Sequence, residues 1–165
     1  MNTAEITSLL RGVGCQYADF LGVFARDKLP LPRTSKPICL IANVDKHNQR
    51  GSHWIAMYIN PQTETGSLFD PYGVAPEEEF VTYMNTLTNG RWIYNTVRLQ
   101  SEYSTTCGQY CVMFVYFKCR GYTFDEFIDL FTTDTVVNDF IVTDLIRTEF
   151  GVNFPILDIH YLLDA

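Results

Sequence analysis

The sequence lacks the features that mark membrane-spanning, secreted and metal-binding proteins. No run reaches the ~18 apolar residues that a membrane span needs, and residues 1–5 do not begin a signal peptide. The cysteines are odd in number and show neither a secreted disulfide framework nor paired metal-ligand spacing; they stand at positions 15, 39, 107, 111 and 119. We therefore expect a soluble, unsecreted, intracellular protein in a reducing compartment, with no metal and no membrane partner.

Basic residues are scarce as well. Twelve Lys and Arg stand against nineteen Asp and Glu, which gives a formal net charge of −7. This balance argues against a large nucleic-acid-binding surface, so DNA is not an expected partner. The chain also has no phosphate-cradling Gly-rich loop and no Gly-x-Ser-x-Gly turn, which removes the usual nucleotide-binding and serine-hydrolase classes. No cofactor is expected.

Apolar and aromatic residues are plentiful. Hydrophobic residues make up 47% of the 165 positions and aromatic residues 15%. A chain of this size and composition can bury a sizeable core, so we expect one domain over residues 1–165 and a monomer.

The order of apolar patterns predicts an α+β protein. Period-two and buried runs predict strands at 37–44, 53–60, 66–70 and 92–99. Capping signals and helical spacing predict helices at 3–13, 76–88, 107–119, 123–131 and 134–150. This order favours a mainly antiparallel central sheet flanked by helices. We expect residues 20–33, with two prolines, to form an extended surface crossing, and the apolar tail 154–163 to dock on the body or on another chain.

One cysteine lies where a predicted strand passes into a predicted buried helix. Cys107 would open that helix, whose unpaired N–H groups and positive dipole end favour a thiolate over a thiol. Its own backbone N–H and the side-chain amide of Gln100 are candidate donors to a developing oxyanion. The plainer alternative is a buried structural cysteine, since buried free cysteines are common.

A histidine and an aspartate mark the ends of two other predicted strands. His53 begins one and Asp70 ends the next, and in an antiparallel pair these positions fall at the same end. An imidazole held by a carboxylate is a base that can activate a cysteine from elsewhere in the chain. The plainer alternatives are a packed histidine and a simple Asp-Pro-Tyr-Gly turn.

Together these pieces resemble the adenain-like cysteine endopeptidases, the adenovirus maturation protease family with its relatives in virus-like DNA transposons. The match covers much of residues 10–117, and its ordered pieces are Gly14-Cys15, Phe20-Leu21-Gly22, Gly51-x-His53-Trp54, Leu68-Phe69-Asp70-Pro71-Tyr72-Gly73 and Gln100-(six residues)-Cys107-Gly108-x-x-Cys111-x-Met113-Phe114. The resemblance implies a papain-like fold of the adenain type. It also implies His53 as base, Asp70 in the acidic position, Gln100 in the oxyanion hole and Cys107 as nucleophile. The adenovirus enzyme has Glu in the acidic position, so Asp70 departs from it by one methylene.

The same resemblance implies an endopeptidase that cleaves capsid and core precursor proteins at glycine-containing sites during particle maturation, in the virion or the host nucleus or cytoplasm. One alternative is a protease of the same clan that removes ubiquitin-like modifiers, in which the glutamine usually stands one residue closer to the cysteine. Another is a catalytically retired capsid-binding module. No cysteine lies between Asp70 and Gln100. In the adenovirus enzyme, an activating peptide is joined through a disulfide to a cysteine a little upstream of the oxyanion glutamine. This chain has no cysteine there, so we do not expect a disulfide-linked activator. A non-covalent activating peptide remains open.

Overall fold

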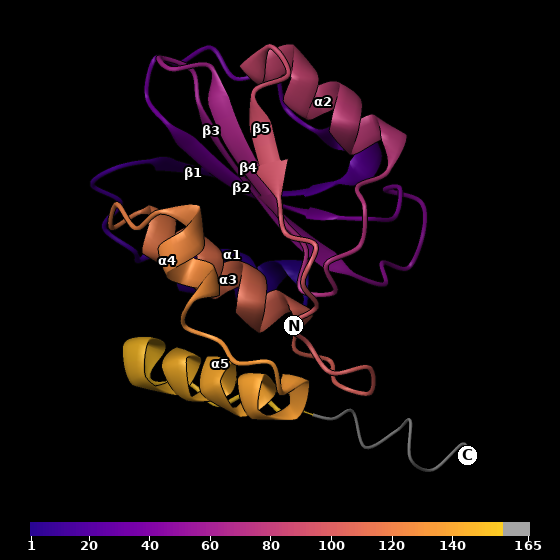
Figure 1. Ribbon diagram of the computed structural model, residues 1–165, viewed down its shortest axis with the longest axis vertical. Helices are drawn as coiled ribbons and strands as arrows, with labels where there is room; N and C mark the ends of the chain where they lie inside the picture. Colours follow the sequence, from indigo (N-terminus) through magenta and orange to yellow (C-terminus); the bar gives the residue numbers. More distant parts are fainter. Residues whose placement is uncertain (157–165) are drawn as a thin grey trace.

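A five-stranded mixed sheet forms the centre of the molecule, as seen in the computed structural model, which describes residues 1–156 (Figure 1). The strands follow sequence order across the sheet: β1 (Asp19–Ala25), β2 (Ile38–Asn43), β3 (Trp54–Asn60), β4 (Thr65–Phe69) and β5 (Trp92–Tyr94). The central pairings β2–β3 and β3–β4 are antiparallel, whereas β1–β2 and β4–β5 are parallel. The predicted α+β class is confirmed, with antiparallel pairing confined to the centre.

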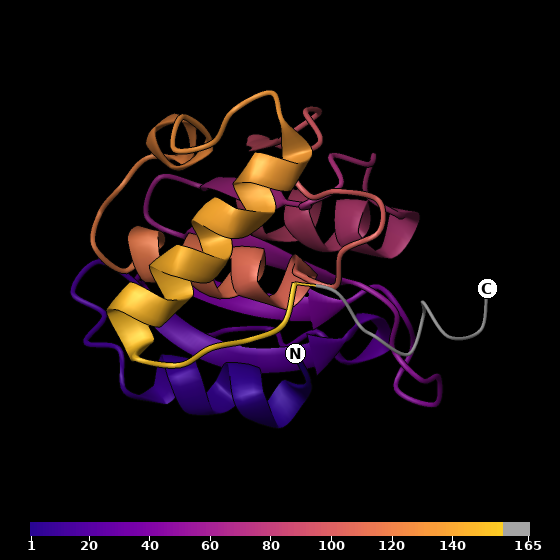
Figure 2. The same ribbon diagram turned by 90° about the horizontal axis from the view of Figure 1, so that it is seen from below.

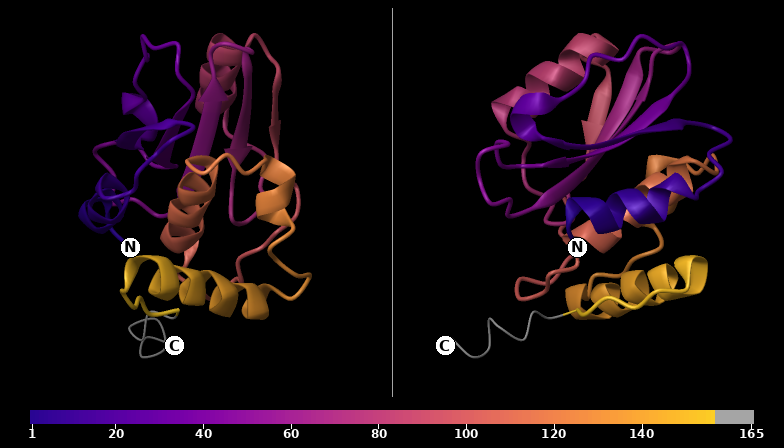
Figure 3. Two further views of the ribbon diagram at one scale, coloured as in Figure 1. Left: turned by 90° about the vertical axis from the view of Figure 1, so that its left-hand side faces the viewer. Right: turned by 180° about the vertical axis from the view of Figure 1, so that it is seen from behind.

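Helices cover both faces of this sheet. The helical segments are α1 (Thr3–Arg11), the short 3-10 turn η1 (Arg26–Lys28), α2 (Glu78–Thr88), α3 (Cys107–Lys118), α4 (Phe124–Ile128) and α5 (Thr135–Phe150). Figure 1 and the right-hand view of Figure 3 show α2 on one side of the sheet, and α1 and α3 on the other. Figure 2 shows α5 crossing over α3 on its outer side. None of the helices among residues 1–156 has the length and apolarity needed to cross a bilayer.

The period of two along β2 divides the interior into two cores. Every residue of β2 is buried. Ile38, Leu40 and Ala42 belong to the core under α2, whereas Cys39 and Ile41 face the core around α3. A strand that is buried on both faces has an almost continuous apolar sequence. The position of β2 was therefore predictable from the sequence.

Helix α3 is buried almost all round, as its apolar sequence predicted. Its Phe114 stacks on Phe69 of β4 with ring centroids 5.3 Å apart, and Phe127 of α4 meets both rings edge-on. This packing fixes α3 against the middle of the sheet. The first residue of α3 is therefore held at a defined point beside the ends of β3 and β4.

Three expectations need correction. The segment predicted as an extended crossing contains a regular edge strand, β1, which pairs in parallel with β2, because only its later part holds the prolines. The predicted strand 92–99 ends at Tyr94, because the Asn95 side chain bonds the backbone of Asp70 and draws the chain off the sheet. Cys15 and Cys119, 104 residues apart, form a disulfide, which the expectation of a reducing compartment did not foresee.

The start of the apolar tail docks on the body. Phe154 packs against the core around α3, and the carbonyl of Ile156 accepts a hydrogen bond from the Thr105 N–H at 3.0 Å. The rest of the predicted docking segment lies outside the described residues. For residues 154–156, the predicted docking on the body is confirmed.

Candidate active site

Cys107 is the first residue of α3, as predicted. The first N–H groups of a helix have no intrahelical partner, so this end of α3 favours negative charge on the sulfur. Burial acts to raise the pKa of the Cys107 thiol, but the neighbouring His53 imidazole and its positive charge outweigh it, and the pKa lies below its ordinary value. The geometry therefore favours a thiolate at this position.

His53 lies immediately before β3 and faces the carboxylate of Asp70, which follows β4. The Nε2 atom of His53 is 2.7 Å from Oδ1 of Asp70, and both side chains are largely buried. Burial acts to lower the pKa of His53, but Asp70 and Cys107 raise it to about 9. Because Nε2 is occupied by Asp70, the other ring nitrogen, Nδ1, remains to exchange a proton with Cys107.

The carboxylate of Asp70 is fixed by the turn that follows it. The Tyr72 N–H donates to Oδ1 at 2.8 Å, and the Gly73 N–H donates to the Asp70 carbonyl at 2.8 Å. Gly73 has a φ of +64°, and a Cβ there would lie 2.7 Å from the backbone of Val97. The Asp-Pro-Tyr-Gly segment is thus a turn that also holds the Asp70 carboxylate in position.

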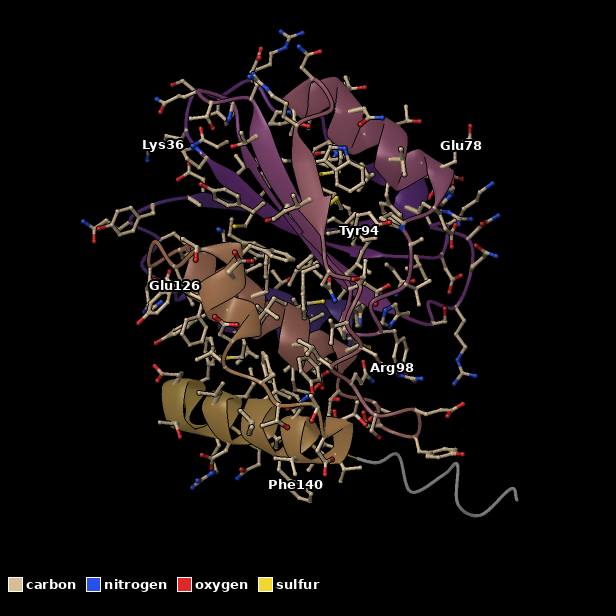
Figure 4. The ribbon with its side chains drawn as sticks, in the orientation of Figure 1. Lys36, Glu78, Tyr94, Arg98, Glu126 and Phe140 are labelled. Carbon is tan, nitrogen blue, oxygen red and sulfur yellow. A yellow bond between two sulfur atoms is a disulfide. The ribbon has the colours of Figure 1, made fainter. Side chains whose placement is uncertain are left out.

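Tyr72 adds a contact that sequence reasoning missed. Its ring stacks on the His53 imidazole with centroids 4.6 Å apart and an interplanar angle of 21°. The Arg98 guanidinium lies over the same tyrosine, 4.8 Å from the ring centroid. Figure 4 labels Arg98 in the segment that leads from β5 toward the start of α3. The imidazole is therefore held by a hydrogen bond at its edge and a ring on its face.

Gln100 lies in the loop that leads into α3. It is 1% exposed, its backbone N–H donates to the Pro71 carbonyl at 3.0 Å, and its side-chain Nε2 donates to the Ser104 carbonyl at 2.9 Å. A primary amide has two N–H donors, so this bond leaves a second one. The structure thus shows Gln100 bracing the loop, and its oxyanion role remains a prediction.

A buried aspartate on α5 holds the same loop from its other side. Asp139 is 1% exposed and accepts hydrogen bonds from Thr106 Oγ1 at 2.9 Å, Tyr110 OH at 3.1 Å and the Ser101 N–H at 3.3 Å. The sequence predicted this helix but no role for Asp139. The available signal was an acid inside the apolar run Val136–Val142, where a helix turned toward a core would carry none unless it were paired.

Cys111 lies one turn after Cys107 and belongs to the core around α3. Burial raises the pKa of its thiol well above the ordinary value. Among residues 1–156, no cluster of three His, Cys, Asp or Glu side chains is placed to hold a metal ion. His47, the other described histidine, is a loop residue with a half-exposed side chain 2.5 Å from Asp27.

A cavity of about 240 Å³ opens beside the His53–Asp70 pair. Its walls are mainly apolar and include Tyr72, Val74 and Phe80. His53 and Asp70 thus border an open space, and Cys107 lies close enough to His53 for its charge to raise the pKa of the imidazole. The fourth predicted site residue, Gln100, supports the loop that carries the cysteine.

Comparison with known proteins agrees with this arrangement. The family described as adenovirus endoprotease matches residues 20–142. The chain is 28% identical over 126 residues to the protease of Human adenovirus A serotype 12, covering 68% of this chain and 61% of that protein. It is 30% identical over 125 residues to the protease of Human adenovirus B serotype 3, covering 68% and 59%. The chain therefore spans about three fifths of the length of these relatives.

Among solved structures, the crystal structure of an ASFV protease superposes with a TM-score of 0.60 at 13% identity. The superposition covers 86% of this chain and 65% of that one, which shows a shared fold. The family match extends over most of the chain and includes His53, Asp70, Gln100 and Cys107. The chain belongs to the adenovirus endoprotease family.

Proposed function

We propose that the protein is a cysteine endopeptidase with Cys107 as nucleophile, His53 as base and acid, and Asp70 as the group that orients the imidazole. The observation that carries the proposal is the 2.7 Å contact between His53 and Asp70, combined with the lowered pKa of Cys107 beside that imidazole. This is the arrangement that nucleophilic catalysis by cysteine requires.

In this mechanism the Cys107 thiolate attacks the carbonyl carbon of the scissile peptide bond. The negative charge that develops on the oxygen is met by the Cys107 backbone N–H and by the free N–H of Gln100. His53, protonated at Nδ1, gives its proton to the leaving amine as the C–N bond breaks, which leaves a thioester on Cys107. Water, deprotonated by His53, then releases the carboxylic acid and the free thiol.

The family match supports a proposal for the substrate class. We propose capsid and core precursor proteins cleaved at glycine-containing sites, and action in the virion or the infected cell. The cavity supports a site with room for a substrate side chain, because its walls are mainly apolar and include both His53 and Asp70.

The test is an assay of the purified protein with three kinds of substrate: Gly-Gly peptides, Gly-x-Gly peptides, and ubiquitin-like proteins with a C-terminal tag. We expect cleavage of glycine-containing peptides, and complete loss of it in Cys107→Ala. The matched control is Cys39→Ala, because Cys39 is buried in the core. This substitution should leave turnover within about twofold of wild type. Preferential cleavage of the tagged proteins would point instead to a deconjugating protease. No cleavage of any substrate would favour a retired binding module.

A further inference from the structure

Lys118, the last residue of α3, is a largely buried lysine whose ammonium has no carboxylate partner among residues 1–156. The residue is 8% exposed, and its Nζ lies 4.1 Å from the ring centroid of Tyr58. None of the ion pairs formed within residues 1–156 includes Lys118. Burying a charge without a counterion is costly, so a largely buried, unpaired lysine gains free energy when an anion binds beside it.

The ammonium opens onto a cavity of about 340 Å³. Its wall contains Tyr17, Tyr58 and Tyr122 together with Asn60 and Thr123. Phenol and amide groups can donate hydrogen bonds beside the cation, which suits a ligand with negatively charged oxygens. The volume lies at the small end of ligand pockets, which range over about 300 to 1,000 Å³.

This wall is tied in place by covalent and backbone bonds. The Cys15–Cys119 disulfide fixes the segment before Tyr17 to the end of α3, and the N–H of Tyr17 donates to the Cys119 carbonyl at 3.2 Å. Gly121 has a φ of +86°, and a Cβ there would lie 3.2 Å from the Tyr17 ring. These bonds hold the residues around the cavity in place before any ligand binds.

The acid whose charge acts on Lys118 already has another role. Glu126 of α4, labelled in Figure 4, accepts a hydrogen bond from the Thr123 N–H at 2.7 Å and completes the capping box of that helix. Burial lowers the pKa of the Lys118 ammonium, and the charge of Glu126 only partly offsets this. Glu126 therefore does not act as a direct counterion of Lys118.

We propose that this cavity binds a carboxylate group, with Lys118 as its charged ligand and the surrounding tyrosines and Asn60 as its neutral contacts. One cation balances the charge of a monoanion but not that of a doubly charged phosphate, and the net charge of −7 disfavours dianions. The site lies at the opposite end of α3 from Cys107, roughly 16 Å away along the helix axis at 1.5 Å per residue. It is thus separate from the proposed catalytic site and does not depend on it.

The test is an NMR titration of the ¹⁵N-labelled protein near neutral pH and at constant ionic strength, following the amides of Gly121 and Tyr122. The probes are acetyl-Gly-Phe with a free C-terminal carboxylate, the same dipeptide as its C-terminal amide, and sodium acetate. We expect saturable shifts with the carboxylate form and none with the amide. Tighter binding of the dipeptide than of acetate would indicate a peptide terminus as the natural ligand, and equal binding a small carboxylate.

Lys118→Met keeps the aliphatic packing on Tyr58 and should weaken binding at least tenfold, whereas Lys36→Met, at an exposed lysine, should not change it. If Lys118→Met does not fold, Lys118→Gln and the amide comparison in the wild-type protein decide the question. The proposal is overturned if neither carboxylate probe shifts these amides. Equal binding of the amide form, or unchanged binding by a folded Lys118 variant, would overturn it as well.

Discussion

The Nε2 atom of His53 lies 2.7 Å from Oδ1 of Asp70, although 17 residues separate them in sequence. The antiparallel pairing of β3 and β4 produces this contact, because it brings the beginning of one strand beside the end of the next. Because Asp70 engages Nε2, the other ring nitrogen, Nδ1, is left to exchange a proton with Cys107. The charge of Asp70 therefore acts on the pKa of the same imidazole that serves Cys107.

Asp70→Asn should shift the alkaline limb of activity to lower pH. Asp70 helps to raise the pKa of His53 to about 9, so removing its charge lowers that pKa, and the imidazole then loses its proton earlier as pH rises. Turnover should fall less than in Cys107→Ala, because orientation is disturbed while the bond-forming atom stays. The measurement is a pH–rate profile of Asp70→Asn and of the wild-type protein, with Cys107→Ala as the inactive reference. An alkaline limb at the wild-type position in Asp70→Asn would remove Asp70 from the site.

The same shift gives a stability contribution with a defined sign. The pKa of His53 is higher in the folded protein than its ordinary value of 6.5, so protonation favours the folded state. This contribution is complete below about pH 6.5 and is lost as the pH rises through about 9. Thermal unfolding of Asp70→Asn should accordingly show a weaker loss of stability across that window than the wild-type protein.

Gln100→Ala should lower kcat by about 10² to 10³, the usual cost of losing one oxyanion donor. Because the side chain also bonds the Ser104 carbonyl, circular dichroism and thermal unfolding must show that the fold is retained. The rate of Cys107 alkylation serves as the internal control, since alkylation by a haloacetamide generates no oxyanion. If kcat stays within about twofold of wild type, the glutamine has only a structural role.

Asp139→Asn should lower kcat while leaving the alkylation rate of Cys107 unchanged. An asparagine can still accept from Thr106 and Tyr110, but its amide then faces the Ser101 N–H, so one contact of the loop becomes donor against donor. The matched control is Asp144→Asn, at an exposed position of the same helix. Equal losses in the two variants, or a parallel fall in alkylation, would contradict a role in positioning the loop.

Duplex DNA should not stimulate the enzyme. The net charge of −7 offers few clustered cations for the release of counterions, which is the main source of DNA affinity. The measurement is turnover at low and high salt, with and without duplex DNA and without any added peptide. A stimulation of about tenfold or more that disappears at high salt would reveal a basic patch that the total charge conceals.

The sequence was most informative where a chemically reactive residue stands at the end of a predicted helix or strand. Cys107 at a helix start, and His53 and Asp70 at strand ends, were predictable because strand period and helix signals place those positions without knowledge of distant contacts. The continuous apolar run of β2 identified a buried strand for the same reason. Local reasoning therefore placed three of the four predicted site residues, as well as the order of elements around them.

Contacts between distant segments were not predictable in this way. Asp139 acts on the loop before Cys107 from 33 residues further along the chain, and Cys15 meets Cys119 across 104 residues. The early end of β5 depends on bonds between Asn95 and the backbone of Asp70. Each is a tertiary interaction that overrides the local pattern, and neither periodicity nor spacing encodes it.

In the proposed mechanism Cys107, activated by His53, forms the covalent intermediate. The most direct test of this step is intact-protein mass spectrometry after acid quenching of a reaction with an ester substrate that ends in Gly-Gly, followed by peptide mapping. We predict one acyl adduct, located on Cys107 and absent from Cys107→Ala, because burial raises the pKa of Cys39 to about 12 and that of Cys111 well above its ordinary value. An adduct on another residue, or substrate cleavage that persists in Cys107→Ala, would contradict the assignment.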